Sequence, residues 1–308
     1  MNKFSNVSLK IIIIMLLLVS AVYFAYHDAL NNDFQAWDTK AYVVDNVHIQ
    51  AFTWENIQWM FTAFYKSNWH PLTWLSHATD YALFGLNPWG HHLVNLIIHS
   101  LNTILFFGLV IVLISFKSAT GNISQLAPIN NKTLLAAGIA ALLFSIHPQH
   151  VESVVWIAER KDVLCLFFIL LASLCYVFYN TAQTARWYLA TLLSFVLALL
   201  AKPMAVTFPV ILLLLDVYPL HRTRLTNSFA TVSWYKLFIE KIPFFALTLF
   251  SIIITIVAQH QGGAIPTTEM LGIEIRFLNA FNSLIFYISK FLFPIGLSPY
   301  YPYPTYSN

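Results

Sequence analysis

The chain has 308 residues, of which 58% are hydrophobic and only 9% are charged, and its formal net charge is +3. So small and dispersed a positive charge gives no indication of nucleic-acid binding. The two cysteines, Cys165 and Cys175, lie in one apolar run, which argues against a disulfide framework. The apolar runs are continuous rather than alternating, so they predict membrane-spanning helices of about 20 residues rather than a barrel.

The first predicted span is 11–26, which two lysines precede. Aromatic residues near its end fit a membrane interface better than the small-residue cleavage site of a signal peptide. Residues 27–88 form a large first loop with no run long enough to cross a membrane. Within it, 53–64 and 71–84 have the pattern of amphipathic helices that lie along a membrane surface.

The remaining apolar runs predict spans at 92–116, 133–146, 163–179, 187–201, 204–218 and 242–258. Residues 275–293 have their polar side chains mostly on one side, which predicts an interfacial helix, with an eighth span as the alternative. The sequence therefore predicts an all-α polytopic transmembrane bundle of about seven to eight spans, organised as one membrane domain over residues 1–308.

The distribution of charge predicts an orientation. A cytoplasmic N-terminus puts the larger share of Lys and Arg on the inner side. All acids except Asp216 and Glu240 then fall on the outer side. One face is therefore expected to carry the first loop, the polar segment 145–164, Lys202 and the loop after the seventh span.

The segment 145–164, SIHPQHVESVVWIAERKDVL, places ionisable groups at the junction of two predicted spans. Such groups are costly near lipid and often functional, although an interfacial loop with snorkelling charges is the alternative. Cations here could hold a phosphate, and carboxylates could act as bases on a hydroxyl. The candidate ligands for a donor phosphate or an acceptor are His147, His150, Glu152, Arg160, Lys161 and Lys202. The HxxH spacing before Glu152 does not match a metalloprotease motif, so no metal site is assigned.

Three runs carry a family resemblance: WENIQWMFTAFYKSNWHPLTWLSHATDYALFGLNPWGHHLVNLIIHSLNT (54–103), HPQHVESVVWIAERKDVL (147–164) and AKPMAVTFPVILLLLDVYPL (201–220). In this order they closely resemble the membrane half of bacterial tetratricopeptide-repeat membrane proteins, which are similar to eukaryotic transmembrane O-mannosyltransferases. The resemblance implies a GT-C fold in the bacterial inner membrane. It also implies a glycosyltransferase with a polyprenyl-phosphate sugar donor, an acceptor protein or lipid, and an extracytoplasmic active site. No cofactor is assigned; a divalent metal is compatible with such an enzyme, but no residue pattern supports one.

In that family the first loop carries an acidic pair in a segment resembling FxxxDD followed by YVxxN. Here the segment is FQAWDTKAYVVDN, and the matching residues are Phe34, Asp38, Tyr42, Val43 and Asn46. Thr39 occupies the second acidic position. The resemblance makes Asp38 the candidate catalytic base, with a solvated loop acid as the alternative. The histidines of the first matching run, His70, His77, His91 and His92, are predicted to pack and hydrogen-bond rather than to catalyse.

Relatives of this type continue with a soluble array of repeats of about 34 residues, and no repeat of that period occurs in this sequence. We therefore expect a short form, a truncated product or one piece of a split protein. Two other functions stay open. A non-catalytic membrane scaffold with the same fold is favoured by Thr39 and by the missing repeats. A transporter would need internal repeats and broken helices, of which the sequence offers only the Lys202-Pro203 break.

Overall fold

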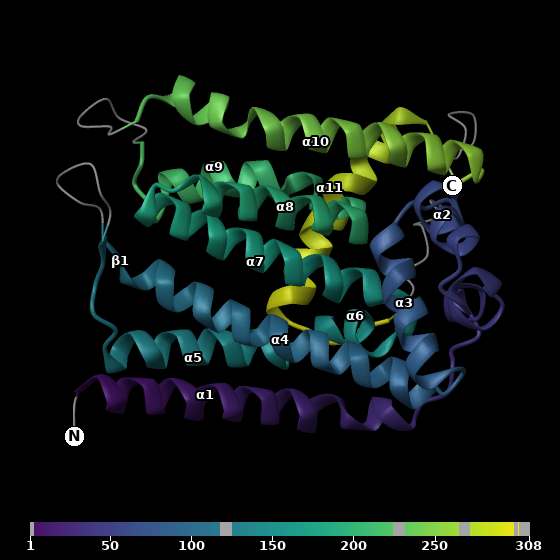
Figure 1. The fold of residues 1–308 in the computed structure, drawn as a ribbon, viewed down its shortest axis with the longest axis horizontal. Helices are drawn as coiled ribbons and strands as arrows, with labels where there is room; N and C mark the ends of the chain where they lie inside the picture. The colour runs from purple at the N-terminus through teal and green to yellow at the C-terminus, as the bar shows by residue number, and fades with distance from the viewer. Residues whose placement is uncertain (1–2, 118–124, 224–231, 265–271, 299–300, 302–308) are drawn as a thin grey trace.

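The computed structural model describes the chain except for residues 1–2, 118–124, 224–231, 265–271, 299–300 and 302–308. Seven helices run side by side along the long axis of the molecule (Figure 1): α1 (Lys3–Tyr26), α4 (Pro88–Ser115), α5 (Asn131–Ser145), α7 (Arg160–Ala182), α8 (Ala185–Ala201), α9 (Phe208–Val217) and α10 (Trp234–Gln261). Two two-residue strands, β1 (Phe116–Lys117) and β2 (Gln125–Leu126), pair antiparallel between α4 and α5.

Shorter helical elements connect the long helices. The first loop contains η1 (His27–Asn31), η2 (Lys40–Val44), η3 (Val47–Ile49), α2 (Trp54–Thr62) and α3 (Pro71–Phe84). The polar segment contains η4 (Pro148–His150), α6 (Val151–Val155) and η5 (Ile157–Glu159). A further turn, η6 (Pro203–Thr207), joins α8 to α9, and α11 (Ile273–Leu292) follows α10.

In the described part of the chain, four helices are long and apolar enough to cross a membrane: α1, α4, α7 and α10. Pairing α5 with Pro148–Val155, which are bent by 48° relative to each other, adds a fifth candidate. Helix α8 and the segment Pro203–Val217 are apolar but shorter. These helices make the chain a multi-pass membrane protein, and the count of seven to eight spans stays a prediction.

Local sequence signals explain where several helices begin. Pro71 and Pro88 occupy the first turns of α3 and α4, where a missing N–H costs nothing. The Asn87 side chain caps α4 by accepting a hydrogen bond from the Trp89 N–H at 3.1 Å. Thr53 caps α2 in the same way, accepting from the Asn56 N–H at 3.3 Å. Helices α2 and α3 occupy the two stretches of the first loop that were predicted to be helical, and their position along a membrane surface stays a prediction.

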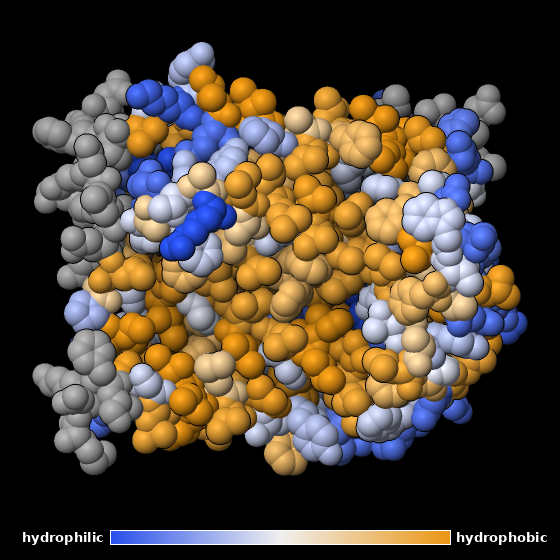
Figure 2. Space-filling model, in the orientation of Figure 1, coloured by the Kyte–Doolittle hydropathy of each residue, from blue (hydrophilic) through white to orange (hydrophobic). Residues whose placement is uncertain are grey.

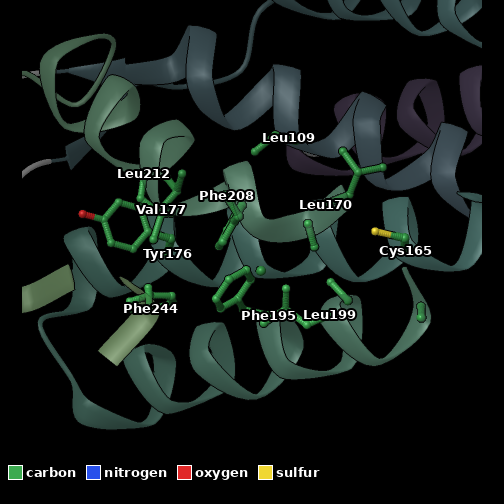
Figure 3. Packing of buried hydrophobic residues seen from close by; sticks show 14 of the residues in the cluster. Leu109, Cys165, Leu170, Tyr176, Val177, Phe195, Leu199, Phe208, Leu212 and Phe244 are labelled. Carbon is green, nitrogen blue, oxygen red and sulfur yellow. The ribbon is translucent and has the colours of Figure 1, made fainter. Parts of the chain in front are cut away.

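The largest apolar core lies among α4, α7, α8, α9 and α10 (Figure 3). At its centre the Phe195 ring packs 5.4 Å from Phe208 and 5.6 Å from Phe244, measured between ring centroids. All three side chains are fully buried. Helices α8 and α9 are short, but they pack onto α7 and α10 and therefore belong to the same bundle.

The bundle has two polar ends and an apolar middle. Figure 2 shows hydrophobic residues across the middle of one face and hydrophilic residues gathered toward the ends. We call the end that carries α2, α3 and α6 the outer end, and the end with β1 and the start of α10 the inner end (Figure 1). The first loop and the polar segment share the outer end, in agreement with the prediction that one face carries both. Of the acids predicted on that face, Glu269 lies outside the described residues.

Helix α11 runs obliquely to the long helices (Figure 1), and no described side chain in it is fully buried. It is not among the helices that meet the criteria for a membrane span. Its assignment as an interfacial helix or an eighth span stays a prediction.

Candidate functional site

A cavity of about 830 Å³ lies at the outer end, where the first loop, the polar segment and α11 meet. We call it the outer cavity. Its aromatic walls come from Trp37, Trp156, Phe286, Tyr287 and Tyr301, and its polar groups from Gln35, Gln149, Glu152, Lys290 and Ser298. Small-molecule sites usually have volumes of roughly 300–1,000 Å³ and combine apolar walls with a few polar groups. The outer cavity therefore has the size and composition of a ligand site.

One side of the outer cavity is built from the two indoles of Trp37 and Trp156, which meet edge to face at 5.9 Å between ring centroids. The Trp156 Nε1–H donates to the Thr39 hydroxyl at 3.0 Å. That hydroxyl in turn donates to Gln35 Oε1 at 3.1 Å. Thr39, at the position where the resemblance expects an acid, therefore fixes the first loop against the polar segment.

Asp38, the predicted base, is exposed and directly follows Trp37 in the chain, but it is not among the residues that line the outer cavity. Tyr42 is buried, and burial is the main cause that raises the pKa of its hydroxyl. The nearby carboxylates of Asp38 and Glu159 raise this pKa further. The Lys161 ammonium sits 5.2 Å from the centre of the Tyr42 ring. Tyr42 thus lies between the loop that carries Asp38 and the charged groups at the start of α7. The structure brings these two parts of the predicted site to one region.

The charged groups beside Tyr42 form ion pairs with one another; we call Glu159, Lys161, Asp162 and Lys202 the outer charge cluster. Glu159 Oε1 is 2.8 Å from the Lys161 ammonium, and Glu159 Oε2 is 3.3 Å from that of Lys202. Lys202 also contacts Asp162, which accepts a hydrogen bond from Ser153 at 3.0 Å. Lys161 and Lys202, two of the three predicted cations, are therefore already paired with carboxylates.

The local sequence explains how this cluster forms. Glu159 and Asp162 flank the N-terminus of α7, where the helix dipole favours negative charge. Lys202 precedes a proline, which holds it in an extended conformation (φ −154°, ψ 131°) at the end of α8. Burial acts to lower the pKa of Lys202, but Asp162 and Glu159 outweigh it and leave the pKa raised, so the side chain stays protonated.

Arg160 does not reach the outer cavity, because its side chain is completely buried. Its guanidinium donates to Asn95, to Ser76 Oγ at 2.8 Å, to Asp80 Oδ2 at 2.6 Å and to the His91 carbonyl at 2.8 Å. These partners belong to α3 and α4. Arg160 therefore ties α7 to both helices, and the geometry separates it from its neighbour Lys161.

The other predicted ligands are divided between the cavity and the packing around it. Glu152 lines the outer cavity. The His147 ring stacks on Phe291 of α11, and its Nε2 lies 3.1 Å from the Phe291 carbonyl. The His150 ring packs on Phe144 and His99. Glu152 is thus placed to meet a ligand, whereas both histidines contact neighbouring side chains and backbone.

Lys290 is a cavity residue that the sequence argument did not select. It stands on α11, where its ammonium lies 5.5 Å from the centre of the Phe286 ring and 3.2 Å from the Gly296 carbonyl. No ion pair of Lys290 is found among the described residues. The only sequence signal was its place among the polar residues of an amphipathic segment, and that signal could not show which cavity the segment faces.

The two acids predicted on the inner side also lie in an ion cluster. Lys241 Nζ is 2.5 Å from Asp216 Oδ2, and an Arg222 nitrogen is 2.7 Å from Glu240 Oε2. The Tyr176 hydroxyl donates to Asp216. We call these five residues the inner charge cluster. Because it joins α7, α9 and α10 at the inner end, far from the outer cavity, we assign it to packing between helices.

Comparison with curated proteins gives similarity to protein O-mannosyl-transferases. The chain is 30% identical over 229 residues to Protein O-mannosyl-transferase TMTC2 of Homo sapiens, and 29% identical over 229 residues to that of Mus musculus. Each alignment covers 67% of this chain and 24% of the relative. It is also 31% identical over 195 residues to Protein O-mannosyl-transferase TMTC4 of Homo sapiens, covering 58% of this chain and 25% of that protein.

The chain therefore spans about a quarter of the length of these relatives. No protein-family model matches the sequence, and no solved structure matches it. The relatives agree with the resemblance to transmembrane O-mannosyltransferases, whereas the likeness to bacterial tetratricopeptide-repeat proteins and the GT-C fold stay predictions. They support a glycosyltransferase-like role at the membrane for the region that aligns.

Proposed function

We propose that this protein transfers a sugar from a polyprenyl-phosphate donor to a hydroxyl of an acceptor protein or lipid at the outer cavity. The observation that carries the proposal is the outer cavity itself. It lies beside Asp38 at a polar end of a membrane bundle, in a chain about 30% identical to protein O-mannosyl-transferases. A donor held in the bilayer could present its headgroup to such a cavity without leaving the membrane.

The proposed reaction is a single displacement at the anomeric carbon of the sugar. The Asp38 carboxylate takes the proton from the acceptor hydroxyl as its oxygen bonds to that carbon. The bond from the carbon to the phosphate oxygen breaks, and the polyprenyl phosphate leaves with the electron pair. Lysine ammonium groups stabilise the charge on the leaving phosphate.

The residues take different parts in this proposal. Trp37 and Trp156 offer flat faces for the sugar, and Glu152 offers a hydrogen-bond acceptor for its hydroxyls. Lys290 supplies a cation inside the cavity, while Lys161 and Lys202 could bind phosphate once it displaces their carboxylate partners. Arg160, His147 and His150 support the wall through their packing rather than by touching the donor.

The membrane setting completes the proposal. We infer a GT-C-like bundle with about seven to eight crossings, the shorter apolar helices included. The N-terminus lies in the cytoplasm and the outer end faces the extracytoplasmic side, as in a bacterial inner membrane. The excess of basic residues predicted on the inner side supports this orientation.

A transfer assay tests the proposal in membranes that contain the protein, with radiolabelled polyprenyl-phosphate sugars as donors. Replacing a general base should lower the rate by about 10²–10⁴-fold, so we expect that loss in Asp38→Asn. The matched control is Asp45→Asn in the same loop, an exposed acid paired with Lys40 at 3.2 Å, which should transfer at the wild-type rate. Equal rates for wild type and Asp38→Asn would remove Asp38 as the base.

A non-catalytic scaffold is the second candidate. Two observations favour it. Thr39 stands where an acid is expected, and its hydroxyl accepts a hydrogen bond from Trp156 in the cavity wall. Both lysines of the outer charge cluster are already paired with carboxylates. Folded wild-type protein that transfers none of the sugars would support the scaffold. Transfer that depends on Asp38 would exclude it.

A further inference from the structure

Three side chains with metal-ligating atoms lie together between α3 and α4, apart from the outer cavity. They are His77, Asp80 and His91, and their ligand atoms all lie within 4.8 Å of one another. His77 and Asp80 are three positions apart on α3, which places both on one face of that helix. His91 faces them from the first turn of α4. All three side chains are buried.

Three of the four ring nitrogens in this group lack hydrogen-bond partners in the protein. Neither ring nitrogen of His77 makes a hydrogen bond to another residue, and the same holds for Nδ1 of His91. Leaving such a buried polar atom unsatisfied costs stability. The group therefore needs an additional binding partner, and the partner must suit nitrogen and oxygen donors.

The orientation of His91 indicates what that partner is. Its Nε2 lies 3.0 Å from the Gly85 carbonyl, which can only accept, so Nε2 carries the proton. Its Nδ1 points toward Asp80 and lies 3.5 Å from Oδ2. A cation bound between these two atoms would have a ring nitrogen and a carboxylate oxygen as ligands.

The surroundings match those of a metal site. A ligating histidine usually donates its second nitrogen to a carbonyl, as His91 does to Gly85, and a ligating carboxylate is usually hydrogen-bonded, as Asp80 is by Arg160.

We propose that His77, Asp80 and His91 bind a zinc ion that fastens α3 to the start of α4. Two imidazoles and one carboxylate form a common three-residue zinc ligand set, with the fourth position left to water. The ion would also steady the wall of the outer cavity through Arg160 and Asn95, whose side chain donates to the Trp156 carbonyl at 3.4 Å.

Metal analysis of the full chain tests the proposal without any transfer assay. The protein is purified without a polyhistidine tag, and mass spectrometry measures its metal content. We expect about one zinc per chain in wild type, and a loss of at least tenfold in His77→Gln and in His91→Gln. His27→Gln changes an exposed histidine at the start of η1 and should keep the ion.

A second measurement uses wild type alone, so that it does not depend on whether a variant folds. Removal of zinc by a chelator should lower the melting temperature, and added zinc should restore it. Cobalt added to the chelated protein should give visible absorption bands that saturate at one ion per chain. Wild type that neither holds zinc nor responds to it overturns the proposal, as does zinc retained by both histidine variants.

Discussion

Thr39 stands where the family resemblance expects an acid, yet its hydroxyl still holds the first loop against the polar segment. It accepts the Trp156 indole N–H at 3.0 Å, a bond that a carboxylate at the same position could also accept. An acid at position 39 could therefore hold the first loop against the polar segment through Trp156, in addition to any role in the reaction. The sequence could not show this, because Trp156 is distant along the chain.

Buried histidines make the outer end sensitive to acid, and His70 is the clearest case. Burial, with a smaller effect of Lys161, lowers the pKa of His70 to about 3. The unfolded chain takes up a proton near pH 6.5, whereas the folded chain does not. Stability therefore falls as the pH drops below 6.5. At pH 5 the loss from His70 is about 2 kcal/mol, which should appear as a lower melting temperature than at pH 7.5.

The variant His70→Gln separates this effect from general acid sensitivity. Its melting temperature should fall less between pH 7.5 and pH 5 than that of wild type. His27→Gln, which changes an exposed histidine, should follow wild type. If His70→Gln shows the same fall as wild type, the ring is not the source of the acid sensitivity.

At the scale of elements, the junction of α3 and α4 depends on one glycine. A Cβ added at Gly90 would lie 2.1 Å from Cγ of Phe84, and it would also press on the Cβ of that residue. The clash is with atoms next to the Phe84 backbone, which a change of rotamer cannot move far, so α3 and α4 would have to move apart. We expect Gly90→Ala to destabilise the protein by about 1–3 kcal/mol, measured by denaturant or thermal unfolding.

Gly108 provides a control within the same helix. A Cβ at that position meets no atom within 4 Å. Gly108→Ala should therefore be neutral, or stabilising by up to about 1 kcal/mol through helix propensity. A loss of stability of the same size in both variants would show that contact with Phe84 is not the cause.

The helices that the sequence predicted best are those with local signals at their ends. Proline at the first turn marked α3. Apolar runs located both ends of α4 and α7 to within four residues, whereas α1 and α10 begin eight residues before their predicted spans. The bend after Ser145 was not predicted as a broken span, because the apolar pattern gives no measure of the angle between consecutive helices. Helix ends are local properties, whereas the angles between helices are set by tertiary packing.

At the scale of the whole molecule, the sequence predicted which segments share an end but not which side chains pair. Arg160 and Lys161 were expected to act together, yet successive residues on a helix point about 100° apart. One side chain enters the protein to meet Asp80, and the other turns toward Tyr42 and Glu159. The Glu159 and Asp162 carboxylates that neutralise Lys161 and Lys202 could be identified only from the folded chain.

The two ends predict a pattern of chemical labelling. Single cysteines are introduced after Cys165 and Cys175 are replaced by alanine. Asn32→Cys and Gln261→Cys, exposed at the outer end, should react with a membrane-impermeant maleimide from one side of the membrane. Thr184→Cys, exposed between α7 and α8 at the inner end, should react only from the other side. Reaction of Asn32→Cys and Gln261→Cys from opposite sides would contradict a shared outer end and the cavity built there.

The length of α5 has a consequence for the lipid around the protein. Its 15 residues extend about 22 Å, less than the hydrocarbon thickness of about 30 Å. If α5 crosses the bilayer alone, acyl chains next to it would have to shorten to match it, at a cost of a fraction of a kcal/mol per ångström. We then expect the bilayer to be thinnest beside Pro148 and Gln149, which border the outer cavity. A lipid phosphate there would lie closer to the midplane than one elsewhere around the protein.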